Sequence, residues 1–191
     1  DEIIFSEALF PDDYDPAFGR GRLFMGKNDK LMGLFSFTED KLLAFMRNSI
    51  FVCTPTTNLR EMKKTLVTQE VGLVARKSIV QVGNRILFLS DNGVYSVTFE
   101  DLYNLRGNDI PLSEPIQDTI NGINKNYWHN AVAVYFDNRY YLAVPSANST
   151  VNDTLLIFNF LNNEWESRDV VDGFVLGTAG QVDWNIRNLL I

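Results

Sequence analysis

The stretch of sequence that decides the fold is VYFDNRYYLAVPSANSTVNDTLLIFNFLNNEW, residues Val134–Trp165. Its apolar runs are separated by segments rich in Asn, Asp, Ser and Pro. Short apolar runs bounded by such residues are typical of strands joined by hairpin turns and loops. The stretch therefore predicts two strands, a loop, a third strand and a turn that leads into a fourth strand at Trp165.

The same pattern occurs twice upstream, at Gly33–Cys53 and at Lys77–Val97. Each copy has a turn, a basic residue, an apolar run, a second turn and another apolar run. The three copies align on the basic residue after the first turn, which is Lys41, Arg85 or Arg139. Gly-Asn and Asn-Gly pairs at the turns of the second copy favour hairpins because they supply positive φ at low cost. We therefore interpret the three stretches as copies of one repeat.

Several of these runs are apolar at consecutive positions, as in ILFL at 86–89 and LLIF at 155–158. A strand with this pattern is covered on both faces, like a blade between two neighbouring blades. The sequence therefore predicts an all-β fold of β-propeller blades, with about three four-stranded antiparallel meanders and part of a fourth. The expected blades are residues 1–56, 72–110 and 130–169, and the next blade starts within 173–191. In the first of these, Glu2–Phe10 is expected to be an outer strand.

Two short helical insertions are expected between the blades, at residues 58–68 and 112–122. In the first, Leu59, Met62 and Leu66 follow helical spacing, and a surface loop remains an alternative. The signals of the second are Ser113 as the N-cap, Pro115 in the first turn, Ile116 and Ile120 on one face, and Gly122 at the end.

The composition limits the classes of function. The chain has 191 residues, of which 46% are hydrophobic, and a formal net charge of −7. This acidic balance argues against wrapping around DNA or RNA, because phosphate binding needs a basic footprint. A single cysteine allows no internal disulfide, and no apolar run reaches the roughly 18 residues of a membrane-spanning helix. The first residue, Asp1, and the apolar final run predict that the sequence is a segment of a longer chain.

Candidate catalytic and metal-binding residues are few. His129 and Cys53, the only histidine and the only cysteine, are expected to be structural, because neither has a reactive partner nearby in the sequence. The acidic stretch Pro11–Pro16 lacks the spacing of a calcium loop, so a solvated turn is the favoured interpretation. The stretch Gly19–Arg22 lacks the spacing of a phosphate-binding loop. We therefore expect no enzymatic activity, no cofactor and no metal site.

The order and spacing of several stretches resemble the β-propeller structural proteins of tailed bacteriophages, which occur in the tail, neck or nozzle of the virion. The stretches that carry this resemblance are Ile3–Asp13, Lys41–Val52, Ser78–Val97, Pro111–Asn124 and Asn138–Ser167. The resemblance implies a virion component that forms a ring with copies of itself and contacts other tail or neck proteins. It also implies that DNA passes nearby without specific binding. The chain would then contribute to a DNA ejection conduit.

A different class of function remains open at this point: a receptor- or glycan-binding propeller module of a tail fibre or adhesion protein. Propellers commonly bind partners through the loops on one face. The longest loop expected here, Ser146–Thr154, and the aromatic pair Tyr127 and Trp128 are the first candidates for such contacts. The candidate partner-contact residues are Tyr127, Trp128, Asn148, Ser149 and Asn152.

Overall fold

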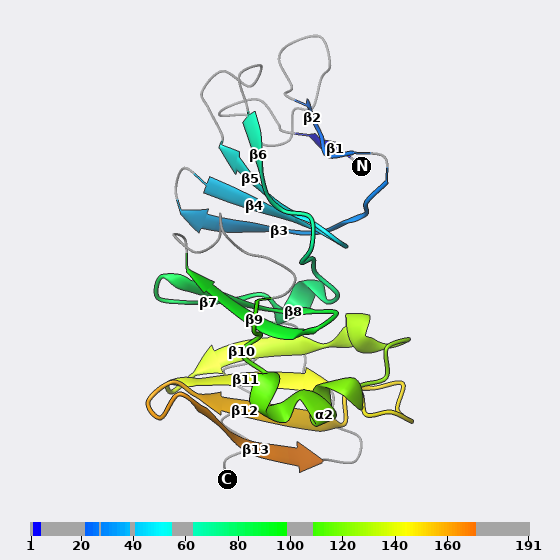
Figure 1. Ribbon diagram of the computed structural model, residues 1–191, viewed down its shortest axis with the longest axis vertical. Helices are drawn as coiled ribbons and strands as arrows, with labels where there is room; N and C mark the ends of the chain where they lie inside the picture. The colour runs from blue at the N-terminus through cyan, green and yellow to red at the C-terminus, as the bar shows by residue number, and fades with distance from the viewer. Residues whose placement is uncertain are drawn as a thin grey trace. The chain divides into compact units, whose positions relative to one another are not determined.

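The computed structural model describes residues 2–4, 22–26, 28–38, 41–54, 63–98 and 109–170. Within these ranges the chain is mostly β-structure, in antiparallel sheets with short helical segments (Figure 1). The strands fall into two compact units, a first that runs to Leu73 and a second that starts at Val74. The prediction of an all-β fold is therefore confirmed at the level of antiparallel sheets.

The first unit contains a four-stranded meander and a separate strand pair. In the pair, β1 (Glu2–Ile4) runs antiparallel to β2 (Arg22–Phe24). The strands of the meander follow chain order and are β3 (Leu31–Thr38), β4 (Lys41–Met46), β5 (Ile50–Thr54) and β6 (Lys63–Thr68).

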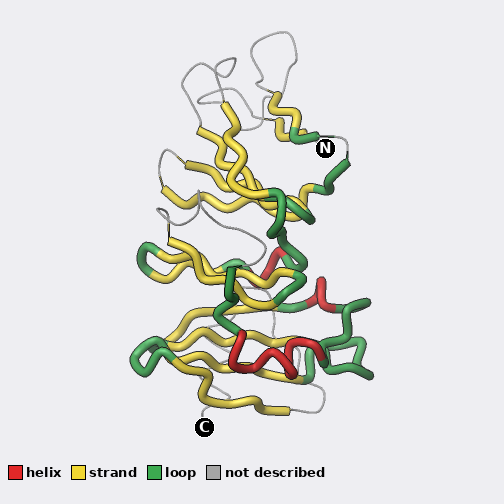
Figure 2. Tube along the Cα trace, in the orientation of Figure 1, coloured by secondary structure: helices red, strands yellow, loops and turns green. Residues whose placement is uncertain are grey.

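The second unit contains two sheets, each again in chain order. The first sheet comprises β7 (Val80–Val82), β8 (Arg85–Ser90) and β9 (Gly93–Thr98). The second comprises β10 (Val132–Phe136), β11 (Arg139–Val144), β12 (Thr154–Asn159) and β13 (Glu164–Val170). The helical segments, red in Figure 2, are η2 (Arg76–Ser78), η3 (Glu114–Ile116), α2 (Gln117–Asn121) and η4 (Trp128–Asn130).

The repeat predicted from the sequence has a structural counterpart. Lys41, Arg85 and Arg139 each occupy the first position of the second strand of their sheet. The turn before Arg139 consists of Asp137 and Asn138, whose φ angles are 47° and 58°. Two positive φ values in a two-residue loop are typical of the hairpin turn that matches strand twist. The sequence therefore placed the second strand of all three copies correctly.

The meander of the first unit is apolar on both faces. Leu43, Phe45, Ile50 and Val52 lie on one face, because Leu43 pairs with Val52 and Phe45 with Ile50. All four side chains are buried. The opposite face carries a second buried cluster. Its members are Ile3, Met25, Ala44, Met46 and Cys53.

Both sheets of the second unit are also apolar on both faces. One shared core joins them, with Leu87 and Leu89 of β8 packed with Leu142 of β11 and Leu156 of β12. The other face of the β7–β9 sheet buries Ile86, Phe88, Tyr95 and Val97. The other face of the β10–β13 sheet buries Val132, Tyr141, Ala143 and Leu155.

The two sheets of the second unit approach each other most closely through their first strands, β7 and β10. Tyr140, fully buried in the core that the sheets share, donates a hydrogen bond from its hydroxyl to the carbonyl of Ser78, 3.3 Å away. Farther along, the predicted insertion at 112–122 packs into the same core through Leu112, Ile116 and Ile120. Trp165 of β13 donates a hydrogen bond from Nε1 to the Leu112 carbonyl at 3.0 Å. The insertion is therefore part of the core and is not a surface decoration.

The helical prediction for 112–122 is confirmed for residues 114–121, with one difference at its start. Ser113 occupies the N-cap position, but its side chain makes no cap hydrogen bond. Its Oγ instead accepts a hydrogen bond from the Val94 amide of β9 at 2.9 Å. Gly93 makes this approach possible, because a Cβ at that position would overlap Ser113 Oγ. The serine therefore ties the insertion to the sheet.

Two predictions for the first unit are wrong. Residues 63–68 are not helical, because Lys63–Thr68 pairs with β5 as the fourth strand of the meander. Its β-branched residues Thr65, Val67 and Thr68 favour an extended backbone, which outweighs the apolar spacing that ends at Leu66. Glu2–Ile4 is not an outer strand of this sheet, since it pairs with β2 and β6 occupies the edge. The first meander therefore extends to residue 68 and not to 56.

Some predicted features lie outside the described residues. They are the acidic stretch 11–16, most of 19–22, the part of the first insertion that precedes residue 63, and the start of a next blade at 173–191.

The reactivity of the Cys53 thiol tests whether the sheet face that carries Cys53 is shielded from solvent. Burial raises the pKa of Cys53 to about 11, against a smaller lowering effect of the Lys64 ammonium. A buried thiol with so high a pKa holds very little thiolate at neutral pH. We expect native protein to react with Ellman's reagent more than about 100-fold slower than protein in denaturant. Equal rates in the two conditions would show that this face is open.

Candidate functional site

The residues predicted as partner contacts meet at one end of the β10–β13 sheet. Tyr127 and Trp128 lie just before β10, whereas Asn148, Ser149 and Asn152 lie in the loop between β11 and β12. The structure joins the two segments, and we call residues 123–130 and 145–153 together the loop platform.

Hydrogen bonds hold the two segments of the loop platform together. Ile123 forms an isolated antiparallel bridge with Ser146, and the Asn124 amide donates to the Pro145 carbonyl at 3.0 Å. The Asn124 side chain donates from Nδ2 to the Ser149 carbonyl at 2.8 Å. These contacts join residues more than 20 positions apart, so the platform is a tertiary feature and not two independent loops.

The surface of the loop platform is partly aromatic and carries one exposed ammonium group, that of Lys125. Tyr127 is 38% exposed and stacks on His129, with ring centroids 6.3 Å apart. The ammonium of Lys125 lies 5.6 Å from the centroid of the Trp128 ring. Val151 adds an apolar side chain that is 45% exposed. Exposed aromatic and apolar groups of this kind are typical of protein contact surfaces.

Not all of the predicted contact residues point outward. Asn148 is exposed and Ser149 is half-buried, but Asn152 is only 6% exposed. Asn152 donates from Nδ2 to the Asn130 carbonyl at 2.8 Å, which ties the loop to the start of β10. Its Oδ1 accepts no hydrogen bond from the described residues. Asn152 therefore supports the platform, while Tyr127 and Asn148 face the solvent.

Asp153 holds the β11–β12 loop in shape. Its Oδ1 accepts a hydrogen bond from the Ser146 amide at 2.7 Å, and its Oδ2 accepts one from Ser146 Oγ at 2.6 Å. Thr154 Oγ1 donates a longer bond of 3.2 Å. Burial raises the pKa of Asp153, but these hydrogen bonds lower it by more, so the net shift is downward.

At the opposite end of the same sheet, charged groups form a separate network. The Arg139 guanidinium donates from Nε to Glu166 Oε2 at 2.7 Å and also pairs with Asp137 at 3.4 Å. The hydrogen bond from Arg139 lowers the pKa of Glu166, and a bond from Asn159 adds to this effect. These charged and polar groups bind one another. The network therefore gives Arg139, at the start of β11, a structural role that needs no ligand.

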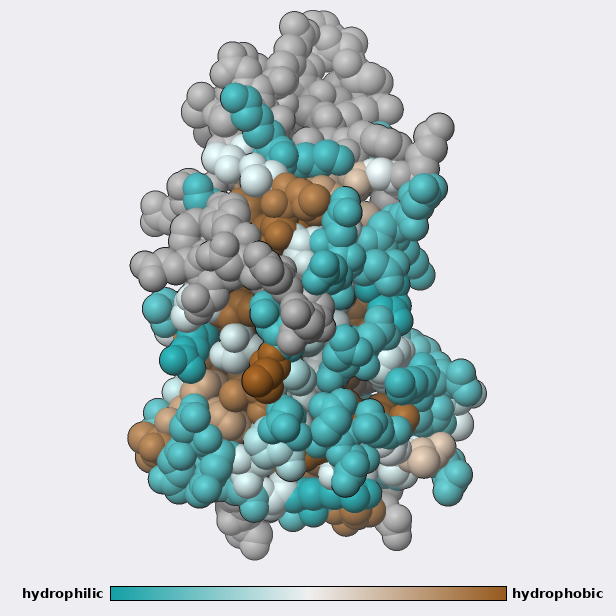
Figure 3. Space-filling view, in the orientation of Figure 1, coloured by the Kyte–Doolittle hydropathy of each residue, from teal (hydrophilic) through white to brown (hydrophobic). Residues whose placement is uncertain are grey.

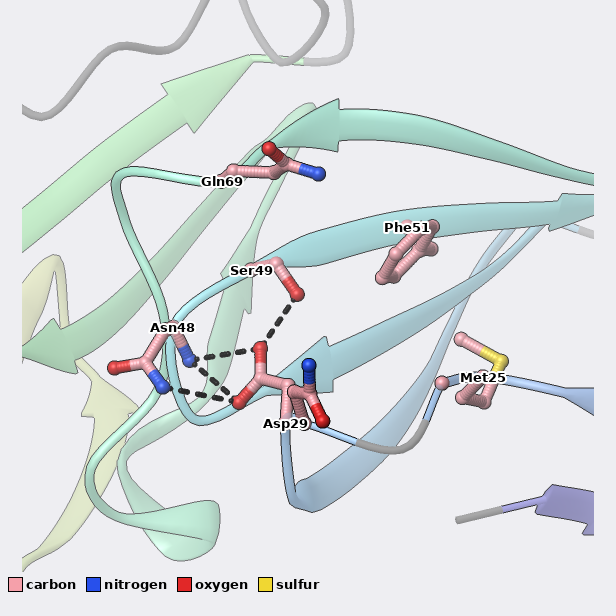
Figure 4. Close-up of a pocket in the computed structure, with 8 residues that line it drawn as sticks. Met25, Asp29, Asn48, Ser49, Phe51 and Gln69 are labelled. Atoms are coloured by element: carbon pink, nitrogen blue, oxygen red, sulfur yellow. Dashed lines mark hydrogen bonds between the residues drawn. The ribbon is translucent and has the colours of Figure 1, made fainter.

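A concavity that sequence analysis missed lies in the first unit. Its volume is about 380 Å³. The residues that line this concavity, which we call the Asp29 pocket, are Met25, Gly26, Asn28, Asp29, Asn48, Ser49, Phe51 and Gln69 (Figure 4). These residues come from the segment before β3, from the β4–β5 turn and the start of β5, and from the position after β6. No local motif unites them, so only the tertiary structure brings them together.

Asp29 organises its pocket through hydrogen bonds to the turn between β4 and β5. Its carboxylate accepts bonds from the Asn48 amide at 3.1 Å and from Asn48 Nδ2 at 3.2 Å. It also accepts one from Ser49 Oγ at 2.7 Å and one from the Lys30 amide at 3.0 Å. The dashed lines in Figure 4 trace the contacts with Asn48 and Ser49. The signal that sequence analysis overlooked is therefore an aspartate just before β3.

Other classes of site find little support in the described part of the chain. No group of three or more His, Cys, Asp and Glu residues there could hold a metal ion. None of the described helices has the length and apolar character that a bilayer crossing requires. His129 lies in η4 on the loop platform, where its ring stacks on Tyr127.

Comparison of the sequence with protein families and with curated proteins finds no match to this chain.

The pH dependence of folding tests the role of Asp153. Because its pKa is lower in the folded state, the ionised carboxylate stabilises the fold above about pH 4, and this stabilisation is lost as the pH falls through the folded-state pKa. We expect Asp153→Asn to lower the melting temperature by about 2–4 °C at neutral pH. The variant should also lose less melting temperature than wild type on acidification to about pH 3.

The exposed aspartate Asp118 provides the matched control, because Asp118→Asn removes a carboxylate outside the loop platform. Thermal melts followed by circular dichroism measure all three proteins. An Asp153→Asn protein with the full acid sensitivity of wild type would contradict the assigned role.

Proposed function

We propose that this chain is a non-enzymatic structural component of a phage tail, in a nozzle, tail tube or neck ring. In this proposal its sheets are blades of a β-propeller and the chain forms part of the conduit for DNA ejection. The observation that carries the proposal is the arrangement of the second unit, where two sheets meet through their first strands and share one core. Sheets that approach at their first strands and are covered on both faces fit the geometry of blades around an axis.

The repeat supports the same proposal. The basic residue that aligns the three copies starts the second strand of each of the three larger sheets, so the copies share this position in structure as well as in sequence. The resemblance to phage propeller proteins rests on these same stretches. The formal charge of −7 fits a passage that DNA must leave freely, because acidic walls repel phosphate.

The loop platform is the part of the second unit best suited to contact another copy or a neighbouring tail protein. It presents Tyr127 and Val151 to solvent beside Asn148, and its backbone is fixed by Asn124 and Asp153. A rigid surface with exposed aromatic groups loses little conformational entropy on binding. In the view of Figure 3, apolar side chains reach the surface in separate patches among hydrophilic ones.

Electron microscopy and native mass spectrometry of the full chain test this proposal. We expect closed rings of several copies. Tyr127→Ser should weaken ring formation about tenfold or more, because aromatic residues dominate interface energies. The control is Leu161→Ser, since Leu161 is 73% exposed but lies in the β12–β13 turn, away from the loop platform.

A chain that stays monomeric in wild-type form would contradict the structural role. If a glycan array then gave selective binding that Tyr127→Ser abolishes, the loop platform would belong to a receptor-binding module of a tail fibre or adhesion protein.

A further inference from the structure

We propose that the Asp29 pocket binds one unit of a neutral saccharide. This inference goes beyond a role in assembly, and it concerns the first unit, whereas the loop platform belongs to the second. Its volume of about 380 Å³ lies within the range of roughly 300–1,000 Å³ that is usual for small-molecule sites.

The walls of the Asp29 pocket are fixed before any ligand binds. The carboxylate holds Asn48 and Ser49 in place from one side of the β4–β5 turn. On the other side, the Leu73 amide donates to the Met46 carbonyl at 2.9 Å. Gly72 packs so closely that a Cβ there would overlap the Arg47 carbonyl. A turn held from both sides keeps its polar groups oriented, which lowers the entropic cost of binding.

The Asp29 pocket offers unused amide groups. Asn28 and Gln69 are exposed, and their side chains make no hydrogen bond within the described part of the chain. The Asn48 side chain uses its Nδ2 on Asp29, which leaves its carbonyl oxygen able to accept. Each amide presents both donors and acceptors, so together they match the hydroxyl groups of a sugar, which also donate and accept.

The opposite side of the Asp29 pocket is formed by two apolar side chains, and the Lys64 ammonium lies 5.1 Å from the ring centroid of one of them, Phe51. Figure 4 shows Met25 and Phe51 near each other, across from Asp29 and Asn48. Met25 is buried and Phe51 is half-buried, so this side is a firm part of the core cluster beside β1. A pocket with an apolar wall and a few polar groups suits a ring that has both C–H faces and hydroxyl edges.

The charge of the lining selects against other ligands. Among the described residues that line the pocket Asp29 is the only charged one, and the Lys64 ammonium lies 5.1 Å from the centroid of the lining Phe51 ring, so the site has one nearby charge of each sign and favours a ligand without a net charge. Its two oxygens already accept bonds from Lys30, Asn48 and Ser49, so few lone pairs remain for a metal ion. A neutral ligand rich in hydroxyl groups is the class that these features favour together.

Ligand-observed NMR with the full chain tests the proposal. The probes are glucose, galactose, mannose and N-acetylglucosamine, with glucuronic acid and N-acetylneuraminic acid as charged comparators. We expect saturable binding of at least one neutral sugar and weaker binding of both acids. In protein-observed spectra, the same sugar should shift the amide resonances of Asn48 and Ser49.

Two exposed substitutions locate the site. Asn28→Ala and Gln69→Ala should each weaken binding about two- to tenfold, as expected for the loss of one hydrogen bond. The control Asn162→Ala removes an exposed amide in the β12–β13 turn and should leave binding unchanged. Melting temperatures equal to that of wild type would show that each variant is folded.

Three outcomes would overturn the assignment: no saturable binding of any neutral sugar, tighter binding of an acidic sugar, or unchanged affinity in both the Asn28 and the Gln69 variants. None of these outcomes bears on ring formation, so the result is independent of the proposed role in assembly.

Discussion

The structure depends on one constraint, which is that each of its three larger sheets buries apolar side chains on both faces. A sheet with a single apolar face can leave the other face in water, but β4, β8 and β11 have no such face. Leu43 and Ala44, neighbours in β4, point to opposite sides and are both fully buried. A sheet of this kind is stable only as a middle layer, since each uncovered apolar side chain would cost about 1.5–3 kcal/mol. Layered packing is therefore a requirement of the sequence itself.

The same constraint explains where polar groups are needed. Where a loop leaves a buried sheet, its backbone amides must find partners. Two aspartates supply such partners in the same way. Asp29 contacts the β4–β5 turn and Asp153 contacts the β11–β12 loop, and each accepts hydrogen bonds from a backbone amide and a serine hydroxyl. In the second copy, the Oγ of Ser113 from the insertion accepts a hydrogen bond from the Val94 amide instead. The pocket and the loop platform both form around an aspartate that accepts hydrogen bonds from the second turn of its copy.

The sequence predicted the strands well because apolar runs and turn residues are local signals. Lys41, Arg85 and Arg139 were placed correctly, and so was the helix that ends at Gly122. β6 was missed because Leu66 fitted a helical spacing, and the pairing with β5 that decides its conformation is a tertiary contact. That the segment with Tyr127 lies against the β11–β12 loop was also not predictable, since it depends on the hydrogen bond from Asn124 Nδ2 to the Ser149 carbonyl. Asp29 stands in the sequence just before β3, but the pocket around it was not predictable because its partners Asn48 and Ser49 lie 19 and 20 residues later.

Charge substitutions on neighbouring positions of β8 test the central claim most directly. Leu87 and Phe88 are both fully buried and point to opposite faces of their sheet. Burial on both sides predicts that Leu87→Asp and Phe88→Asp each abolish cooperative thermal unfolding, because a carboxylate enters an apolar layer in either case. A protein that keeps its melting transition with either aspartate would show that one face is open to water, and the layered account would fail.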